Sequence, residues 1–330
     1  MPGAIHLATI RPAAYPPAIF SPRTHLPAMS VLVAGTLALD SIHTSSEVHH
    51  ELLGGSASYA ALAAAFSGKV QLCGIVGTDF PQPHRDLFSR RSIDTANVDT
   101  VEGRTFRWTG RYHDDMNHRE TLDVSIDVLE KFNPRLTTDA ASASIVLLAN
   151  MSPDNQLAVL DQCTSSPFVI ADSMDLWINI ARPRLLDVLK RVDLFVINED
   201  EAKIFTECSN LVVAGRRLLE MGPRYVVVKK GEHGAMLFGE NHFFTTPAYP
   251  LTQLADPTGA GDTFAGGLAG SLAANARTPD FKDLARGIVH GSVLASFTCE
   301  AFGVRRLAEL TDAEATGRTA EFRACTSWAS

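Results

Sequence analysis

Short apolar runs alternate with helical stretches along most of this chain. The apolar runs have the length and β-branched content of buried strands: Val31–Gly35, Val70–Val76, Ile145–Ala149, Phe168–Ala171, Leu194–Ile197 and Tyr225–Val228. The predicted helices between them are Ala57–Phe66, Asp154–Gln162, Leu185–Arg191, Glu199–Thr206 and Ala214–Met221. Strands that alternate with helices form βαβ units, so the pattern predicts an α/β fold whose mostly parallel sheet is covered on both faces. Ligands of such sheets bind at the carboxyl ends of the strands.

Two polar stretches break this alternation, Ser41–Leu53 and Thr105–Val124. Both have a period of two, which is typical of strands with one solvated face. In the second stretch one face has Thr105, Arg107, Thr109 and Arg111, and the other has Phe106, Trp108, Gly110 and Tyr112. We therefore expect antiparallel strands that form a small sheet outside the main one.

Composition excludes several classes of partner. The chain has 37 acidic and 29 basic residues and a net charge of −8, which disfavours nucleic acids and anionic membranes because both bind basic surfaces. Its five cysteines are widely spaced and lack a Cys-x-x-Cys pair, as expected of a reduced, cytoplasmic protein without structural zinc. No apolar run approaches the ~18 residues that a transmembrane helix needs.

The two ends of the chain differ from the rest. Residues 1–28 are rich in Pro and Ala, contain no Asp or Glu, and lack the apolar core of a secretory signal. We expect a disordered extension, or a start codon assigned too early, because Met29 directly precedes the first strand. Residues 29–310 are the predicted domain, and residues 311–330 are expected to form an amphipathic helix that ends in loose polar residues.

The most informative segment is Asp256–Gly267, which reads DPTGAGDTFAGG. Gly259, Ala260 and Gly261 allow successive backbone N–H groups to turn toward an anion. A predicted helix follows, and its N-terminus adds positive potential. Asp262 would repel a bound phosphate unless its carboxylate removes a proton from the group that attacks the phosphate, so we expect it to be a general base.

This segment resembles the C-terminal signature of the phosphofructokinase-B (ribokinase) family of carbohydrate and nucleoside kinases. Further matches occur in the expected order between about Val31 and Gly303: Asp40 after the first strand, the pair Gly54-Gly55, Asn198-x-x-Glu201, and Lys230-Gly231-Glu232-His233-Gly234. The resemblance implies a ribokinase-like three-layer α/β/α sandwich. It also implies that the small sheet is a lid over the acceptor, which would exclude water from phosphoryl transfer.

The resemblance also implies which residues bind the phosphate donor and its ions. Asn198, Glu201, Lys230, Gly231, Gly234 and His290 match nucleotide-side positions, with Glu201 facing magnesium through water. Asp256 and Thr258 match residues that hold a monovalent cation in ribokinase. Two alternatives stay open, because Asn198 with Glu201 also fits a helix capping box, and Asp256 with Thr258 also fits a turn cap.

On the acceptor side the resemblance implies Asp40, Gly54, Gly55, Asn150 and Arg107. A carboxylate such as that of Asp40 can accept hydrogen bonds from two neighbouring hydroxyls. The chain departs from the family at two acceptor positions. Tyr59 stands where many members have Asn, and Met151 stands where ribokinase has Glu, so ribose itself is not the expected acceptor.

The leading hypothesis is therefore an ATP-dependent kinase of a sugar or polyol, with Mg²⁺ as cofactor and K⁺ left open. The first alternative is a nucleoside kinase that stacks the base on Trp108, Phe106 or Tyr112. A second is a kinase of acidic or phosphorylated sugars held by Arg107 and Arg111. A non-catalytic paralogue is disfavoured because Asp262 and the turn glycines are intact, and pairing of two lids in a homodimer stays open.

Overall fold

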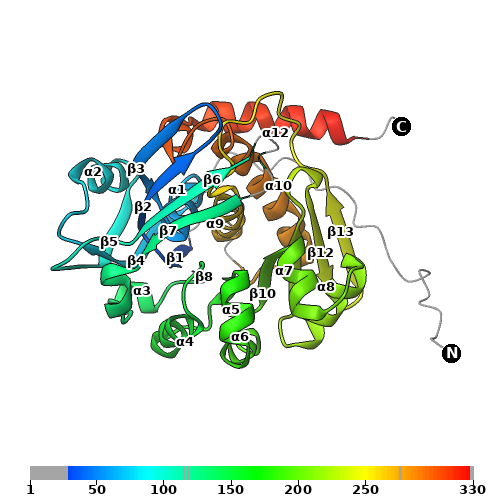
Figure 1. The fold of residues 1–330 in the computed structure, drawn as a ribbon. Helices are drawn as coiled ribbons and strands as arrows, with labels where there is room; N and C mark the ends of the chain where they lie inside the picture. Colours follow the sequence, from blue (N-terminus) through cyan, green and yellow to red (C-terminus); the bar gives the residue numbers. More distant parts are fainter. Residues whose placement is uncertain (1–28, 114–115, 117–118, 275–276, 328–330) are drawn as a thin grey trace.

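The computed structural model describes residues 29–113, 116, 119–274 and 277–327. Within them a nine-stranded sheet has the order β13-β12-β11-β10-β9-β8-β1-β4-β5 (Figure 1). Its strands are β1 (Ser30–Ala34), β4 (Lys69–Gly77), β5 (Ile93–Val101), β8 (Ile145–Leu148), β9 (Phe168–Asp172), β10 (Leu194–Asn198), β11 (Tyr225–Lys229), β12 (Ala235–Gly239) and β13 (His242–Thr246). All neighbours from β5 to β11 are parallel, and β12 and β13 are added antiparallel at one edge.

Helices cover both faces of this sheet, as the sequence pattern predicts. One layer contains α1 (Ser56–Ala64), α2 (Gln82–Arg90), α9 (Ala260–Ala273), α10 (Phe281–Thr298), α11 (Arg305–Glu309) and α12 (Asp312–Thr326). The other contains α3 (Thr138–Ala141), α4 (Pro153–Gln162), α5 (Asp175–Ile180), α6 (Arg182–Leu189), α7 (Glu199–Thr206) and α8 (Leu211–Glu220). In β1, Val31 and Val33 pack into the first layer, whereas Leu32 and Ala34 pack into the second. The three-layer α/β/α sandwich is confirmed.

The lid is a separate four-stranded sheet with the order β3-β2-β6-β7 (Figure 1). Its strands are β2 (Ala38–His43), β3 (Val48–Gly54), β6 (Arg107–Tyr112) and β7 (Arg119–Ser125). The pairs β2–β3 and β6–β7 are antiparallel hairpins, but β2 and β6 pair in parallel. The expectation of a purely antiparallel lid is therefore wrong at the centre. The reason is that β2 and β6 follow the parallel strands β1 and β5 and leave the main sheet in the same direction.

Several features differ from the sequence prediction. The pattern missed β5, whose sequence IDTANVDTV is polar at most positions, and it missed the antiparallel edge strands β12 and β13. The tail is helical as expected, and Ala315 and Phe322 of its helix are buried in the main core. The predicted N-terminal extension 1–28, residues 114–115 and 117–118 of the second lid stretch, and residues 328–330 lie outside the described residues. No helix in the described ranges is long and apolar enough to cross a membrane.

Candidate active site

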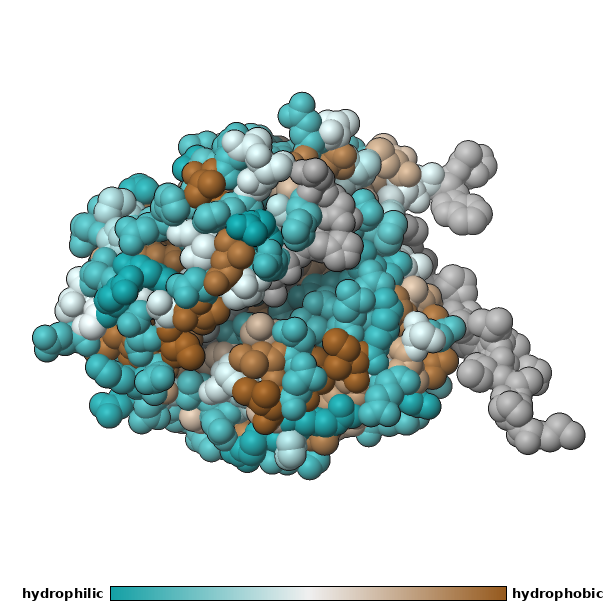
Figure 2. Space-filling view, viewed as in Figure 1, coloured by the Kyte–Doolittle hydropathy of each residue, from teal (hydrophilic) through white to brown (hydrophobic). Residues whose placement is uncertain are grey.

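The predicted site residues meet at the carboxyl edge of the main sheet, below the lid. The strands β8 to β11 end there, and the first turns of α7 and α9 lie at the same edge. Figure 2 shows this face of the molecule hollowed beneath the lid strands, with hydrophilic residues in the hollow and hydrophobic ones on parts of its rim. The sequence placed its candidate residues at this edge, and most of them are found there.

The turn before α9 has the geometry that an anion site needs. Gly259 is in the left-handed region with φ 75° and is the N-cap of α9, and Ala260 and Gly261 are the first residues of the helix. A Cβ on Gly259 would lie 2.5 Å from three carbons of the Tyr59 ring, so only glycine fits on this ring. Asp262 follows in the first turn of α9 and is partly exposed to the hollow.

Asp256 anchors this turn from below. The carboxylate is fully buried and accepts hydrogen bonds from the backbone N–H of Thr258 at 2.9 Å and of Gly303 at 3.1 Å. Burial raises the pKa of Asp256, although these hydrogen bonds offset part of the rise. The Thr258 hydroxyl donates to the Tyr112 hydroxyl of the lid strand β6 at 3.0 Å. Asp256 therefore caps the turn and Thr258 joins the turn to the lid, and the binding of a monovalent cation by the two residues stays a prediction.

A lysine and an aspartate that the sequence analysis did not select lie beside the turn. The Lys229 ammonium, at the end of β11, is 3.2 Å from the Asp172 carboxylate at the end of β9. A Cβ on Gly261 would lie 3.0 Å from the Lys229 Nζ. Burial alone would lower the pKa of Lys229, but the charges of Asp172, Glu201 and Asp262 outweigh burial and raise it. The ammonium therefore stays protonated next to the second glycine of the turn.

Asn198 and Glu201 form the capping box of α7. The Asn198 side chain accepts from the Glu201 N–H at 2.8 Å, and the Glu201 carboxylate accepts from the Asn198 N–H at 3.0 Å. Burial raises the pKa of Glu201 to about 7, against the opposing effect of Lys229. The capping alternative is confirmed, and a role toward magnesium or phosphate stays a prediction.

The glycine loop after β11 lies at the same edge. The His233 N–H donates to the Lys230 carbonyl at 2.9 Å and forms a one-turn 3-10 helix over Gly231–His233, and the Lys230 N–H bridges the loop by donating to the Gly234 carbonyl at 2.7 Å. A Cβ on Gly231 would meet nothing within 4 Å, so the loop faces open space there. This arrangement leaves room for a ligand beside the loop, and its contact with a nucleotide stays a prediction.

His290 does not belong to this site. The sequence placed it ahead of a helix on the nucleotide side, but it lies inside α10 and is 1% exposed. Its Nε2 is 3.3 Å from the hydroxyl of Ser67, which follows α1, and burial lowers the pKa of His290 to about 4. The nucleotide-side expectation for His290 is wrong because the imidazole is sealed between helices.

On the acceptor side, Asp40 and the glycine pair fit together closely. Asp40 is 4% exposed, and a Cβ on Gly54 would lie 1.9 Å from its Oδ2. Gly55 has φ 86°, and a Cβ there would lie 2.5 Å from the backbone oxygen of Thr36. Gly54 therefore leaves space for the carboxylate, and Gly55 allows β3 to turn into α1.

Arg107 forms ion pairs within the protein. Its guanidinium pairs with Asp79 at 2.8 Å and with Glu51 at 3.1 Å, and also donates to the Thr105 carbonyl. Arg111 pairs with Glu120 at 3.4 Å. Through Arg107 the Asp79 and Glu51 carboxylates fasten the lid to the core, and a contact of Arg107 with a substrate stays a prediction.

Asn150 lies at the end of β8, as expected, but its amide is also engaged. It accepts from the Trp177 indole N–H at 2.9 Å and donates to the Met174 sulfur at 3.1 Å, both on the α5 side. These contacts fix the amide at the edge of the hollow. Its contact with an acceptor stays a prediction.

Tyr59 and Tyr112 are further site residues whose positions the sequence could not give. Tyr59 is buried under the turn, and burial together with Asp256, Asp40 and Asp262 raises its pKa well above the ordinary value. In the sequence, Tyr59 is a departure from the family, and Tyr112 is one of three aromatic candidates for stacking a nucleobase. Asp172 and Lys229 are each the last residue of a buried strand, and this position in the sequence was the signal that could have identified them.

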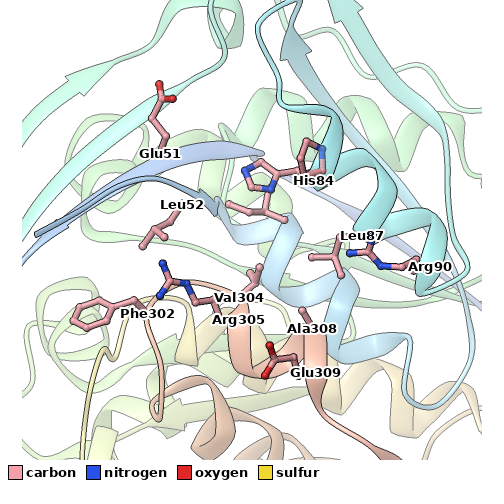
Figure 3. A pocket seen from close by; sticks show the side chains of 12 residues that line it. Glu51, Leu52, His84, Leu87, Arg90, Phe302, Val304, Arg305, Ala308 and Glu309 are labelled. Carbon is pink, nitrogen blue, oxygen red and sulfur yellow. The ribbon is translucent and has the colours of Figure 1, made fainter.

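A second hollow of about 360 Å³ lies on the other side of the lid strand β3 (Figure 3). Leu52, Leu87, Val304 and Ala308 contribute its apolar surface, and charged side chains surround it. It is bounded by β3, α2 and α11 and contains none of the predicted site residues. It is therefore separate from the site at the sheet edge.

The residues at the sheet edge fit a nucleotide with magnesium. The described residues contain no group of three or more His, Cys, Asp or Glu side chains that could hold a metal ion alone. Mg²⁺ is usually held by one or two carboxylates together with phosphate oxygens and water. Glu201 would supply such a carboxylate, and the Gly259–Gly261 turn would face the phosphates.

Comparisons with known proteins agree with this geometry. The model of the pfkB family of carbohydrate kinases matches residues 31–310. A cytidine kinase of Thermococcus kodakarensis is 28% identical over 245 residues, which are 72% of this chain and 87% of that protein. An inositol 3-kinase of Arabidopsis thaliana is 24% identical over 303 residues, which are 86% of this chain and 77% of that protein. In fold, the chain resembles the nucleoside kinase of Methanocaldococcus jannaschii, an archaeal member of the ribokinase family, with a TM-score of 0.71 and 18% identity over 89% of this chain and 98% of that one.

The family match begins in β1 and ends just after α11, so it contains both sheets and the anion turn. The structural likeness independently supports the same fold. This chain therefore belongs to the pfkB family of carbohydrate kinases, which are phosphotransferases with an alcohol group as acceptor.

Proposed function

We propose that this kinase transfers the γ-phosphoryl group of ATP to a hydroxyl group of a nucleoside. The position of Asp262 in the first turn of α9, directly beyond the Gly259–Gly261 turn, is the observation on which the proposal depends. Asp262 removes the proton of the acceptor hydroxyl as its oxygen bonds to the γ-phosphorus. The bond between that phosphorus and the bridging oxygen breaks, and ADP leaves with the electron pair.

The turn supplies the positive potential for this transfer. The backbone N–H groups of Gly259 and Gly261 at this helix N-terminus stabilise the charge of the moving group, whereas the Ala260 N–H donates to the Pro257 carbonyl at 3.1 Å and holds the turn closed. Magnesium, when bound with ATP, neutralises further phosphate charge, and Glu201 would contact it through water. Asp256 caps the turn, and activation by K⁺ bound at Asp256 and Thr258 is a proposal to be tested by exchanging salts.

The choice of a nucleoside has two supports. The relative with 28% identity is named a cytidine kinase, whereas the sequence alone had favoured a sugar or polyol. The second support is the lid aromatic Trp108, which is in register with Asp40 across β2 and β6, while its indole lies over Gly110 and donates to the Thr121 hydroxyl at 3.2 Å. An aromatic ring at this position suits a nucleobase that stacks while Asp40 accepts from ribose hydroxyls.

A polyol is the second candidate acceptor. The relative named inositol 3-kinase favours it, and Asp40 suits neighbouring ring hydroxyls equally well. An acidic or phosphorylated sugar is disfavoured because Arg107 and Arg111 are paired with carboxylates of the protein.

A screen of ADP release across nucleosides, sugars, polyols and sugar phosphates tests the proposal. We expect the highest kcat/KM with a ribonucleoside, and loss of activity with the matching 2′- or 3′-deoxynucleoside as the hydroxyl partners of Asp40 are removed. If polyols are phosphorylated and no nucleoside is, a polyol becomes the first candidate acceptor and a nucleoside is rejected. ADP release that is unchanged in Asp262→Asn would remove Asp262 from the mechanism.

A further inference from the structure

Lys229 and Asp172 are the last residues of two strands on either side of β10. The register aligns Lys229 with Asn198, and Asp172 with Val196, so β10 ends between them. Their side chains meet beyond this end, with the Lys229 Nζ 3.2 and 3.5 Å from the two Asp172 oxygens. Nothing in the motif comparison assigns a role to either residue.

The ammonium lies against the anion turn. A Cβ on Gly261 would lie 3.0, 3.8 and 4.0 Å from Nζ, Cε and Cδ of Lys229, so the end of the side chain runs along this glycine. Gly261 is in the first turn of α9, where free N–H groups already attract an anion. A phosphate oxygen bound by this turn would therefore come within reach of the ammonium.

The local charges favour a ligand rather than a purely structural pair. The Lys229 side chain is 17% exposed and the Asp172 side chain 5%, so both lose much of their hydration. A buried ion pair gains little stability over apolar residues of similar size, because desolvation offsets the attraction. A cation fixed in a protein-lined site, however, stabilises developing negative charge without needing to reorganise.

We propose that Lys229 is a catalytic residue whose ammonium binds the transferring phosphoryl group of ATP, and that Asp172 is the residue that positions it. The proposal rests on the kinase function of the chain and on the placement of the phosphates at the Gly259–Gly261 turn. It adds a full positive charge to an anion site otherwise made of backbone N–H groups. Asp172 holds the long side chain in one orientation through two contacts.

Three variants separate catalysis from structure: Lys229→Met, Asp172→Asn and the double variant. If the pair only joins β9 to β11, the neutral double variant should recover both stability and kcat, because neither charge is left unpaired. If Lys229 binds the phosphoryl group, the double variant should recover its melting temperature while kcat stays reduced by roughly 100-fold or more. If the kcat of the double variant recovers to within about threefold of the wild-type kcat, the proposal is overturned.

A matched control is Lys69→Met. Lys69 also pairs with an aspartate, Asp139 at 2.7 Å, but it lies at the amino end of β4, away from the site. We expect the kcat and KM of Lys69→Met to equal those of the wild type. The same assay thus distinguishes loss of any lysine–aspartate pair from loss of the one at the turn.

A binding measurement makes the test independent of the acceptor. Calorimetric titration with ATP and with AMP, both with Mg²⁺, should show Lys229→Met binding ATP at least about tenfold more weakly and AMP with unchanged affinity. Equal weakening of ATP and AMP would overturn the proposal. Should no nucleoside or polyol be phosphorylated by the wild type, the acceptor assignment fails, while this titration still decides the role of Lys229.

Discussion

Substitution of Gly54 by alanine should displace the Asp40 carboxylate. The added Cβ would lie 1.9 Å from Oδ2, 2.2 Å from Cγ and 2.7 Å from Oδ1 of Asp40. Non-bonded carbon contacts are optimal at about 3.5 Å, so the carboxylate must move by roughly 1.5 Å. Asp40 is 4% exposed, which leaves little free space for this movement. The acceptor hydroxyls would then lose a correctly placed hydrogen-bond acceptor.

The magnitude follows from the hydrogen bonds at stake. A hydrogen bond to a charged group contributes about 1.5–3 kcal/mol, which corresponds to a rise of roughly 10- to 150-fold in acceptor KM. The proposed nucleotide contacts lie at the first turn of α7 and at the Gly231–Gly234 loop, so the KM for ATP should stay unchanged. Overpacking costs about 1–3 kcal/mol of unfolding free energy, partly offset by the smaller entropy of the unfolded chain after Gly→Ala.

Steady-state kinetics with each substrate varied in turn, and urea unfolding, measure both effects. Gly317→Ala is the control, because a Cβ there meets nothing within 4 Å and should leave both KM values unchanged. When Asp40→Ala is also present, the methyl group added by Gly54→Ala no longer meets a carboxylate. The loss of unfolding free energy in the Gly54→Ala/Asp40→Ala double variant should therefore be smaller than the sum of the losses in the two single variants. Loss of hydrogen bonds of this strength must raise the acceptor KM clearly. If the acceptor KM of Gly54→Ala stays within about twofold of the wild-type value, the reasoning is refuted.

Four other changes test the site. Asp262→Asn should keep ATP binding in titration yet lower kcat at least ~100-fold, and a smaller loss would contradict a general base. Gly259→Ala should lower the melting temperature and kcat together, because φ is 75° and the Tyr59 ring lies 2.5 Å from the new Cβ; unchanged melting would contradict this. Trp108→Ala should cost about 1–3 kcal/mol in nucleoside binding and less for polyols, and equal losses in KM would argue against base stacking. Burial raises the pKa of Glu201 to about 7, so its contribution to stability is fully present below about pH 4.5 and is lost as the pH rises to 7. Melting temperatures of Glu201→Gln should therefore fall less than those of the wild type between pH 5 and pH 8, and parallel curves would contradict the raised pKa.

Local pattern was sufficient for the elements that bury a continuous apolar run. The strands β1, β8 and β10 and the helix α7 were predicted nearly to their ends, because buried parallel strands are apolar at every position and the helix begins with a capping residue. β5 was missed because it is an edge strand with polar residues on most positions. The parallel pairing of β2 with β6 was also missed, since pairing depends on which strands precede them.

The sequence by itself determined the family, the anion turn and the position of Asp262, because these depend on residues that are neighbours along the chain. Only the tertiary structure decided the partners of residues far apart in sequence. It paired Arg107 with Asp79 and Glu51 and buried His290 beside Ser67, and these partners all come from other elements. It also brought Lys229 and Asp172 together across β10, next to a glycine on α9. A side chain's role depends on what fills the space around it, and packing of distant segments fixes that space.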